Sequence, residues 1–250
     1  MKRTDLQDWR SLQLAVLILV SLSFAWIWAL FFVTEEANQG EVYRILYVHV
    51  PCAFASFFSA FYLFCSSLLQ IYSKKGNPST SRGLSNYFSL SAEDLSHHAE
   101  ASAEVGLLFT MTTLLTGALW GKPTWGTWWT WDARLTTTFL LSLLFGTYLI
   151  LSRSIPSGPV RRRACAVLGI LIFADVPIIY KSVSWWRTLH QAPSLVREGG
   201  STMDSEILVH LTVCIVLVLC LVLWQIRQRA GNLKLEQEQD RLERGMLSSQ

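Results

Sequence analysis

The stretch ILVHLTVCIVLVLCLVLWQI, residues 207–226, runs for twenty residues without a Lys, Arg, Asp or Glu. A helix needs about 20 apolar residues to cross the roughly 30 Å hydrocarbon core of a bilayer, so this stretch predicts a membrane-spanning helix. Over the whole chain of 250 residues, 51% are hydrophobic and only 16% are charged. These proportions exclude a disordered chain and an ordinary soluble domain, and they indicate an integral membrane protein.

Five further apolar runs have a comparable length. The shortest of them is extended inward by residues 99–103, with Glu100 and Glu104 one turn apart and facing protein or water rather than lipid. The first run is too long for a signal-peptide core and lacks a cleavage pattern of small residues, so we expect it to stay in the mature protein. The sequence therefore predicts an all-α polytopic membrane protein with six transmembrane helices, at residues 11–33, 45–72, 105–120, 133–152, 164–180 and 207–226.

The distribution of basic residues predicts the orientation of these helices. The N-terminus, residues 73–104, residues 153–163 and the C-terminal tail together carry 15 of the 21 Lys and Arg residues. Because basic residues concentrate on the cytoplasmic side, both termini are predicted to be cytoplasmic. The other side carries six basic residues, which are Arg44, Lys122, Arg134, Lys181, Arg187 and Arg197. The net charge of +3 is thus a topology signal, and we expect no nucleic acid binding.

The chain is predicted to form one transmembrane domain, residues 1–226, followed by a cytoplasmic tail, residues 227–250. The tail mixes acids and bases without an apolar stripe, which is typical of a solvated helix or of disorder. Residues 76–83 and 156–159 are rich in turn-forming residues and are predicted to be inner connectors. The five cysteines form no Cys-x-x-Cys pair, so we expect small core residues rather than a redox site.

The segment WGKPTWGTWWTWDARLT, residues 120–136, places five of the eleven tryptophans within twelve positions where one apolar run ends and before the next is established. Pro123 suits the first turn of a helix, and the indoles recur at three and four residues, which predicts a short helix on the outer membrane surface. An aromatic belt at the headgroups would explain Trp26 and Trp28 but not this crowding. We therefore expect a platform for a planar ligand, formed by Trp120, Trp125, Trp128, Trp129 and Trp131.

Two histidines are predicted on the same side of the membrane as this platform. His49 lies about one turn into the second span, and His190 lies just after the fifth. Imidazole is a common metal ligand, and two imidazoles without a Cys or carboxylate cluster suit a metal that a macrocycle already holds. Haem is a flat molecule that needs both an aromatic surface and axial donors. A lone histidine is more often structural, so this interpretation depends on the pair.

Charged residues near these histidines each have more than one reading. Arg44 and Arg134 are predicted to contact the haem propionates, since guanidinium grips a carboxylate in bidentate fashion. Contact with lipid phosphates is the alternative, and Arg187 is left undecided between the two. Asp132 is a candidate ligand contact, a cap of the fourth span or an ion-pair partner of Arg134.

Other polar residues are weaker candidates. Asp175 and His210 lie inside predicted spans, where a structural pair is as consistent with the sequence as a role in proton or ligand movement. His97 and His98 lie among several acids on the predicted cytoplasmic side. Such a cluster is typical of solvated surface, and we expect no functional role for it.

The whole pattern resembles the haem exporter protein C family (CcmC) of the cytochrome c maturation system. The tryptophan-rich segment is similar to the family's WWD signature, with Tyr47-Val-His49-Val-Pro51 before it and Trp185-Trp186-Arg-Thr-Leu-His190 after it. The resemblance covers about residues 40–226 and departs from the family pattern mainly around residues 77–104. It implies that haem b sits on the periplasmic face of the bacterial inner membrane, ligated by His49 and His190 and cradled by the tryptophan helix.

The resemblance also implies a carrier rather than an enzyme. Haem would be presented to a membrane-anchored haem chaperone. The loaded chaperone would then be released by a complex of an ABC transporter permease, its ATPase and a small single-span membrane partner. A second class of function is a b-type haem subunit of a membrane redox enzyme, which would want ligand histidines deep in the bundle. A transporter permease without a cofactor is a third class, and it would leave the tryptophans unexplained.

Overall fold

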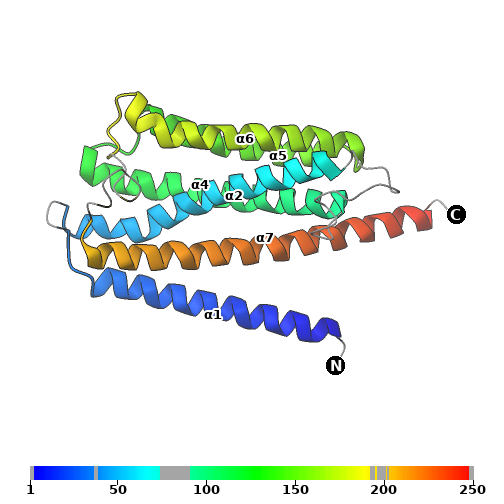
Figure 1. Cartoon of the computed structure of the whole chain (residues 1–250), viewed down its shortest axis with the longest axis horizontal. Coiled ribbons are helices and arrows are strands. Elements are labelled where there is room, and N and C mark those ends of the chain that lie inside the picture. The colour runs from blue at the N-terminus through cyan, green and yellow to red at the C-terminus, as the bar shows by residue number, and fades with distance from the viewer. Residues whose placement is uncertain are drawn as a thin grey trace. The chain divides into compact units, whose positions relative to one another are not determined.

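The computed structural model describes residues 3–36, 39–73, 91–191, 195, 201 and 203–247. Within this part of the chain the fold is all-α, as predicted, and six helices are long and apolar enough to cross a membrane. Each predicted span coincides with the apolar part of one of them. In chain order the elements are α1 (Arg3–Phe31), the 3-10 helix η1 (Glu41–Ile45), α2 (Leu46–Ser73), α4 (Ala92–Trp125), α5 (Ala133–Ser154), α6 (Pro159–Trp185) and α7 (Ser205–Leu247) (Figure 1).

Helix α4 begins earlier than the predicted inward extension at residue 99. The backbone N–H of Asp94 donates to Ser91 Oγ at 3.0 Å, and the Asp94 carboxylate accepts from the Ser91 N–H at 3.1 Å. This reciprocal pair is a capping box, which satisfies two backbone donors that would otherwise have no partner. It fixes the start of the helix at Ala92. The predicted connector at residues 76–83 lies outside the described residues, as does Arg197.

The other end of α4 differs from the prediction. The tryptophan-rich segment contains no separate short helix, because α4 itself continues through Trp120 and Pro123 to Trp125. Gly126 then adopts a φ of +78°, and its N–H donates to the Lys122 carbonyl at 3.0 Å. A glycine in the left-handed region is a common helix end. Residues 126–132 are therefore an irregular connection to α5, and the three- and four-residue spacing of the indoles does not reflect a helix there.

Helix α7 continues without a break from the apolar stretch into the predicted tail. It has 43 residues, so at 1.5 Å per residue it is about 65 Å long, roughly twice the hydrocarbon core of a bilayer. Of the two predicted states for this tail, the helix is therefore confirmed over residues 227–247. The division into a domain of residues 1–226 and a tail stays a prediction.

Contacts divide the chain into two compact units, each made of parts of several helices. The first contains residues 1–56, 108–140 and 178–224, and the second contains residues 57–107, 141–177 and 225–250. The first unit has a core where α1, α2 and α7 meet, and the Trp26 indole N–H donates across it to the Tyr47 carbonyl at 3.0 Å. The buried side chains of this core are Ala25, Ala29, Val33, Tyr47, Ile207, Leu211 and Cys214.

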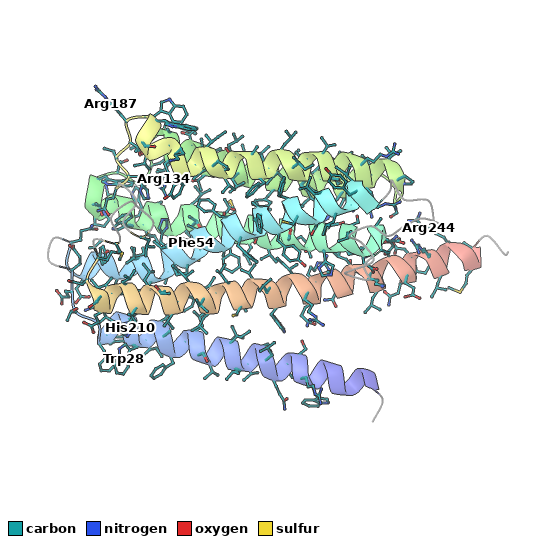
Figure 2. The ribbon with its side chains drawn as sticks, viewed as in Figure 1. Trp28, Phe54, Arg134, Arg187, His210 and Arg244 are labelled. Atoms are coloured by element: carbon teal, nitrogen blue, oxygen red, sulfur yellow. The ribbon has the colours of Figure 1, made fainter. Side chains whose placement is uncertain are left out.

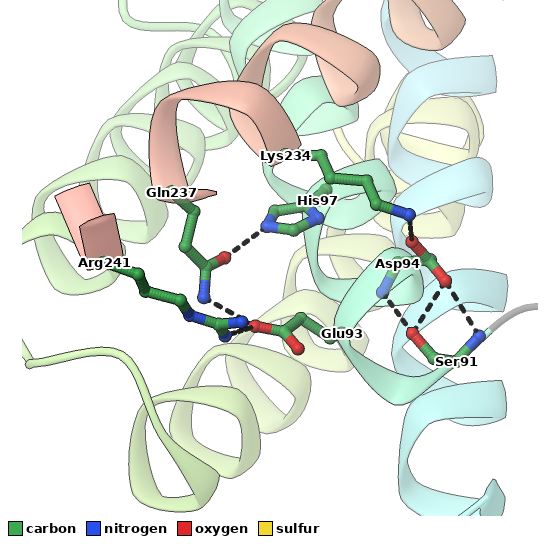
Figure 3. Close-up of polar contacts among 7 residues, drawn as sticks. All are labelled: Ser91, Glu93, Asp94, His97, Lys234, Gln237 and Arg241. Carbon is green, nitrogen blue, oxygen red and sulfur yellow. Dashed lines mark hydrogen bonds and ion pairs between the residues drawn. The ribbon is translucent and has the colours of Figure 1, made fainter. Parts of the chain in front are cut away.

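The second unit holds α4 and the far part of α7 together through polar side chains (Figure 3). Arg229 grips the Glu104 carboxylate with two nitrogens, at 2.6 and 3.1 Å. Further along, Lys234 donates to Asp94 at 2.8 Å, and Arg241 pairs with Glu93. The tail of α7 is thus packed on α4 rather than solvated on all sides.

The cysteines mostly behave as expected. Cys52, Cys165 and Cys214 are buried, and all five are free thiols. Cys220 departs from the prediction because it lies on the exposed face of α7. In a spanning helix that face meets lipid, so a small apolar side chain suits either environment.

Candidate functional site

His49 lies in the first turn of α2, with its imidazole against the backbone of α4. A methyl group added at Gly117 would come within 3.1 Å of the ring, so the absence of a side chain there makes room for it. The Nδ1 atom lies 3.0 Å from Thr116 Oγ1, and that hydroxyl donates its own proton to the Thr112 carbonyl at 2.7 Å. The hydroxyl oxygen must therefore accept from Nδ1–H, which leaves the lone pair on Nε2.

His190 follows α6 in an irregular segment and carries the same tautomer. Its Nδ1 lies 3.1 Å from the Gln191 carbonyl, which can only accept, so the proton is on Nδ1 and Nε2 keeps its lone pair. Burial, together with the positive charge of Arg134, lowers the pKa of His190 to about 4. The imidazole is therefore neutral near pH 7. Among the described residues, Nε2 of neither histidine has a hydrogen-bond partner.

Trp120 brings the two imidazoles to one place. Its ring centroid lies 6.2 Å from that of His49 and 6.0 Å from that of His190, so both rings contact the same indole. The Trp120 side chain is buried, and its indole N–H donates to Gln39 Oε1 at 3.1 Å. A buried, hydrogen-bonded indole cannot rotate freely, so it fixes the surroundings of both histidines.

The remaining tryptophans form two groups rather than one flat shelf. Trp125 lies over the α4 backbone, where a methyl group at Gly121 would meet its ring at 3.1 Å, and it also contacts His190, with centroids 6.2 Å apart. Trp129 and Trp131 form a separate pair, with centroids 5.3 Å apart and planes at 82°. Neighbouring indoles are thus tilted or edge to face, as the quadrupoles of aromatic rings prefer. Trp128 and Trp131 are mostly exposed.

Asp132 connects the tryptophan-rich segment to the segment that carries His190. Its Oδ1 accepts from the Leu135 N–H at 2.9 Å, so it caps α5, which was one of the predicted readings. Its Oδ2 accepts from Thr188 Oγ1 at 2.7 Å and from the Leu189 N–H at 3.3 Å. The ion pair with Arg134 that the sequence also allowed is not formed within the described residues. One carboxylate therefore fixes both the start of α5 and the position of His190.

The arginines differ in what they contact. Arg134 is half-buried, and its guanidinium has no hydrogen bond or ion pair among the described residues. Arg44 instead donates to the Ala29 and Val33 carbonyls, both at 2.9 Å, and pairs with Glu41. The bonds to the two carbonyls cap the end of α1. The Arg44 guanidinium, which the sequence analysis assigned to a haem propionate, is thus already hydrogen-bonded within the protein. Arg187 is exposed and points out beyond the end of α6 (Figure 2).

Several contributors to this site carry no signal of their own in the sequence. Gln39, Thr116 and Thr188 contribute through side-chain bonds to Trp120, His49 and Asp132, which are distant along the chain. Gly117 and Gly121 are one helical turn apart, and that small-residue spacing could have indicated a face where side chains approach the backbone closely. Trp129 Nε1 and Thr130 Oγ1 are buried donors without a partner among the described residues.

The weaker candidates lie elsewhere. His97 is buried, and its Nε2 donates to Gln237 Oε1 at 2.5 Å, so the prediction of a solvated histidine is wrong there. The reason is the tail of α7, which covers this face of α4. His98 lies 3.0 Å from the Tyr62 hydroxyl. His210 is half-buried and stacks on Trp28, with planes at 2°, where α1 and α7 adjoin (Figure 2). Its pairing with Asp175 stays a prediction.

Comparison with known proteins identifies the family. The family described as Heme exporter protein C matches residues 87–244. Heme exporter protein C of Haemophilus influenzae is 35% identical over 210 residues, covering 84% of this chain and 78% of that protein. The protein of the same name from Bradyrhizobium diazoefficiens is 36% identical over 179 residues, covering 72% of this chain and 62% of that protein.

A mitochondrial protein of Marchantia polymorpha, named for cytochrome c biosynthesis, is 37% identical over 175 residues, which cover 70% of this chain and 66% of that protein. The chain thus spans between 62% and 78% of the lengths of these three relatives. The six apolar helices, the WWD segment with its flanking histidines and these matches all agree. The chain belongs to the haem exporter protein C family.

Proposed function

We propose that this protein binds haem through His49 and His190 and holds it for transfer during cytochrome c maturation. The observation that carries the proposal is the arrangement of the two imidazoles. Both contact the Trp120 indole, both have Nδ1 occupied by a hydrogen bond, and both leave the Nε2 lone pair free. A second hydrogen bond that fixes the tautomer is typical of histidines that ligate a metal.

The donor set fits a metal that arrives with its own equatorial ligands. No group of three or more His, Cys, Asp or Glu side chains in the described part of the chain could hold a bare metal ion. Two neutral imidazoles suit haem iron, and the Trp120 and Trp125 faces suit an apolar macrocycle. The unpaired guanidinium of Arg134 is suited to a propionate, because an unpaired half-buried cation is costly and a carboxylate would neutralise it. We do not assign this role to Arg44, since its donors are already committed.

Holding, rather than turnover, is the chemistry that this arrangement favours. Two axial imidazoles leave no open iron position for oxygen or peroxide. We therefore propose a carrier that is not an enzyme. The names of its relatives, which refer to haem export and to cytochrome c biosynthesis, support this class of function.

The exposed indoles supply a surface for handing haem on. Trp128 and Trp131 are 55% and 74% exposed and lie in or beside the irregular connection between α4 and α5, so their indoles are open to a partner. We propose that they, with Trp129, contact a membrane-anchored haem chaperone and the edge of the macrocycle. The positive-inside distribution of Lys and Arg supports a site on the periplasmic face of a bacterial inner membrane. An ABC transporter permease, its ATPase and a small single-span membrane protein are the partners that the family resemblance implies.

The absorption spectrum of the purified protein after expression with ample haem tests the proposal. We expect a Soret band in the wild type and a strongly reduced band in His49→Ala and His190→Ala. His210→Ala is the matched control, because that half-buried imidazole lies in the same unit but contacts neither histidine of the site in the described bonds. No Soret band in the wild type, or equal losses in all three variants, would contradict the assignment. Quinol oxidation by the isolated chain would favour the alternative, a b-type haem subunit of a redox enzyme.

A further inference from the structure

A small cavity lies in the second unit, at the end of the connection between α5 and α6. It has a volume of about 120 Å³, roughly ten times the 10–15 Å³ that a single water requires. Three arginines line it, Arg161 and Arg162 from α6 and Arg241 from α7. The other lining residues are Glu93, Ser96, Ser157, Gly158 and Gln237. None of these residues takes part in the haem site.

The charges around the cavity favour an anion. Glu93 is the one acidic residue among its lining side chains, and its carboxylate is already bound by Arg241 and by Gln237, whose amide nitrogen lies at 2.5 Å (Figure 3). Three guanidinium groups and one carboxylate leave a surplus of two positive charges. The positive end of α6, a helix of 27 residues, adds to this potential because the chain enters it at Pro159.

Two lining side chains have hydrogen-bonding capacity that the protein does not use. Ser96 is only 8% exposed, yet among the described residues its hydroxyl has no hydrogen-bond partner. Arg162 is half-buried, and its guanidinium makes no hydrogen bond or ion pair within the same residues. Both side chains line the open cavity with donors that the protein leaves unused, so an acceptor bound there would satisfy them. A phosphate oxygen accepts from both types of donor.

The location of the cavity indicates the source of the phosphate. Helices α5 and α6 are both candidate spans, so the short connection between them, and the cavity beside it, lies at the membrane surface. Val160 immediately precedes Arg161 and is 71% exposed. Val167 and Leu171 continue this exposed apolar stripe along the same face of α6, at 54% and 58%. The acyl chains of a lipid can pack on such a stripe, whereas a soluble phosphate compound has no apolar chains to contact it.

We propose that this cavity binds the phosphate group of an anionic phospholipid, with Arg162, Arg161 and Ser96 as its donors. The lipid headgroup neutralises the surplus charge, and it joins the start of α6 to the tail of α7 through Arg241. Arg161 already donates to the Ser152 carbonyl at 3.1 Å, so it is held in place for this contact. The site is independent of haem binding.

The test is a titration of the delipidated protein in detergent with dioctanoyl-phosphatidylglycerol, followed by native mass spectrometry. We expect one saturable lipid per chain, and binding about tenfold weaker in Arg162→Gln, which loses a charge-assisted donor. Arg163→Gln is the matched control, since Arg163 is adjacent, exposed and does not line the cavity. Its affinity should equal that of the wild type. Ser96→Ala tests the same site through the buried hydroxyl and serves if Arg162→Gln fails to fold.

Three further arms of the titration identify the ligand. Dioctanoyl-phosphatidylcholine has the same phosphate but no net charge, and we expect it to bind far more weakly. Inorganic phosphate and ATP represent soluble sources. The lipid assignment would be overturned if inorganic phosphate or ATP bound, if Arg162→Gln abolished that binding, and if phosphatidylglycerol did not bind. Equal binding of both lipids, or equal losses in Arg162→Gln and Arg163→Gln, would overturn the site itself.

Discussion

From the hydrogen bond between Thr188 and Asp132 we predict that Thr188, although not itself assigned to contact haem, affects how tightly haem is retained. The Thr188 hydroxyl donates to Asp132 Oδ2 at 2.7 Å and so holds the segment that carries His190. A hydrogen bond to a charged group contributes about 1.5–3 kcal/mol, and because both side chains are half-buried we expect the low end of this range. Thr188→Val keeps the shape of the side chain but removes this bond, together with the acceptor of the His190 N–H at 3.1 Å. A loss of about 1.4 kcal/mol in positioning lowers the apparent haem affinity up to tenfold.

Transfer of haem from the purified protein to excess apomyoglobin, followed in the Soret region, measures this effect as a dissociation rate. Asp132→Ala removes the same bond together with the α5 cap, so it should release haem at least as fast as Thr188→Val. It should also lower the free energy of unfolding by about 1 kcal/mol through the lost cap. The effects in the double variant should be less than additive, since both changes break the Thr188–Asp132 bond while each also removes a bond of its own, His190 N–H to Thr188 Oγ1 and Leu189 N–H to Asp132 Oδ2. Wild-type release from Thr188→Val, or additive effects in the double variant, would refute the tether.

Three other perturbations address the same site. Gly117→Ala should raise the haem dissociation rate several-fold, because its methyl group would meet the His49 imidazole at 3.1 Å. Gly146→Ala is the control and should leave the rate unchanged, since nothing lies within 4 Å of its added methyl group. Equal rates in the two variants would contradict the packing of His49 against Gly117. Arg134→Gln should weaken haem binding about tenfold but leave unchanged the binding of a haem diester, in which the propionates carry no charge. Arg187→Gln, at an exposed side chain, should change the binding of neither ligand. If Arg134→Gln weakened the binding of both ligands equally, a propionate contact would be excluded. Burial lowers the pKa of His190 to about 4, and protons compete with iron for its Nε2. Spectra recorded against pH should therefore show haem retained well below pH 6.5 and lost as the pH approaches 4. A midpoint near pH 6.5 would mean that the imidazole is exposed.

The proposed phosphate cavity shows why some features of this chain have no sequence signal. Ser96 and Arg162 are 66 positions apart, and each is ordinary in its local context. Their unused donors become visible only when α4 and α6 are placed beside the tail of α7. The same tail accounts for the error at His97, which was predicted to be solvated but is covered by Gln237.

The tryptophan-rich segment illustrates both the reach and the failure of local patterns. Its composition indicated a ligand platform, and the structure brings Trp120, His49 and His190 together. The predicted short helix was wrong because indole spacing does not determine backbone conformation. Gly126, which ends α4 with a positive φ, decides the path of the chain there. The cap that Asp132 forms is local, at Leu135, and the sequence offered it as a reading, whereas its bond to Thr188, 56 positions away, has no signal in the residue spacing.

The sequence alone determined the all-α class and the number and approximate limits of the apolar helices, and it supplied the residues of the proposed haem site. It could do so because partition into a bilayer depends on the length and apolarity of one continuous segment. Only the tertiary structure decided that Arg44 is committed while Arg134 is unpaired, and that both histidines keep a free Nε2. Those properties belong to hydrogen bonds between helices far apart in the chain, and such bonds exist only once the helices have packed.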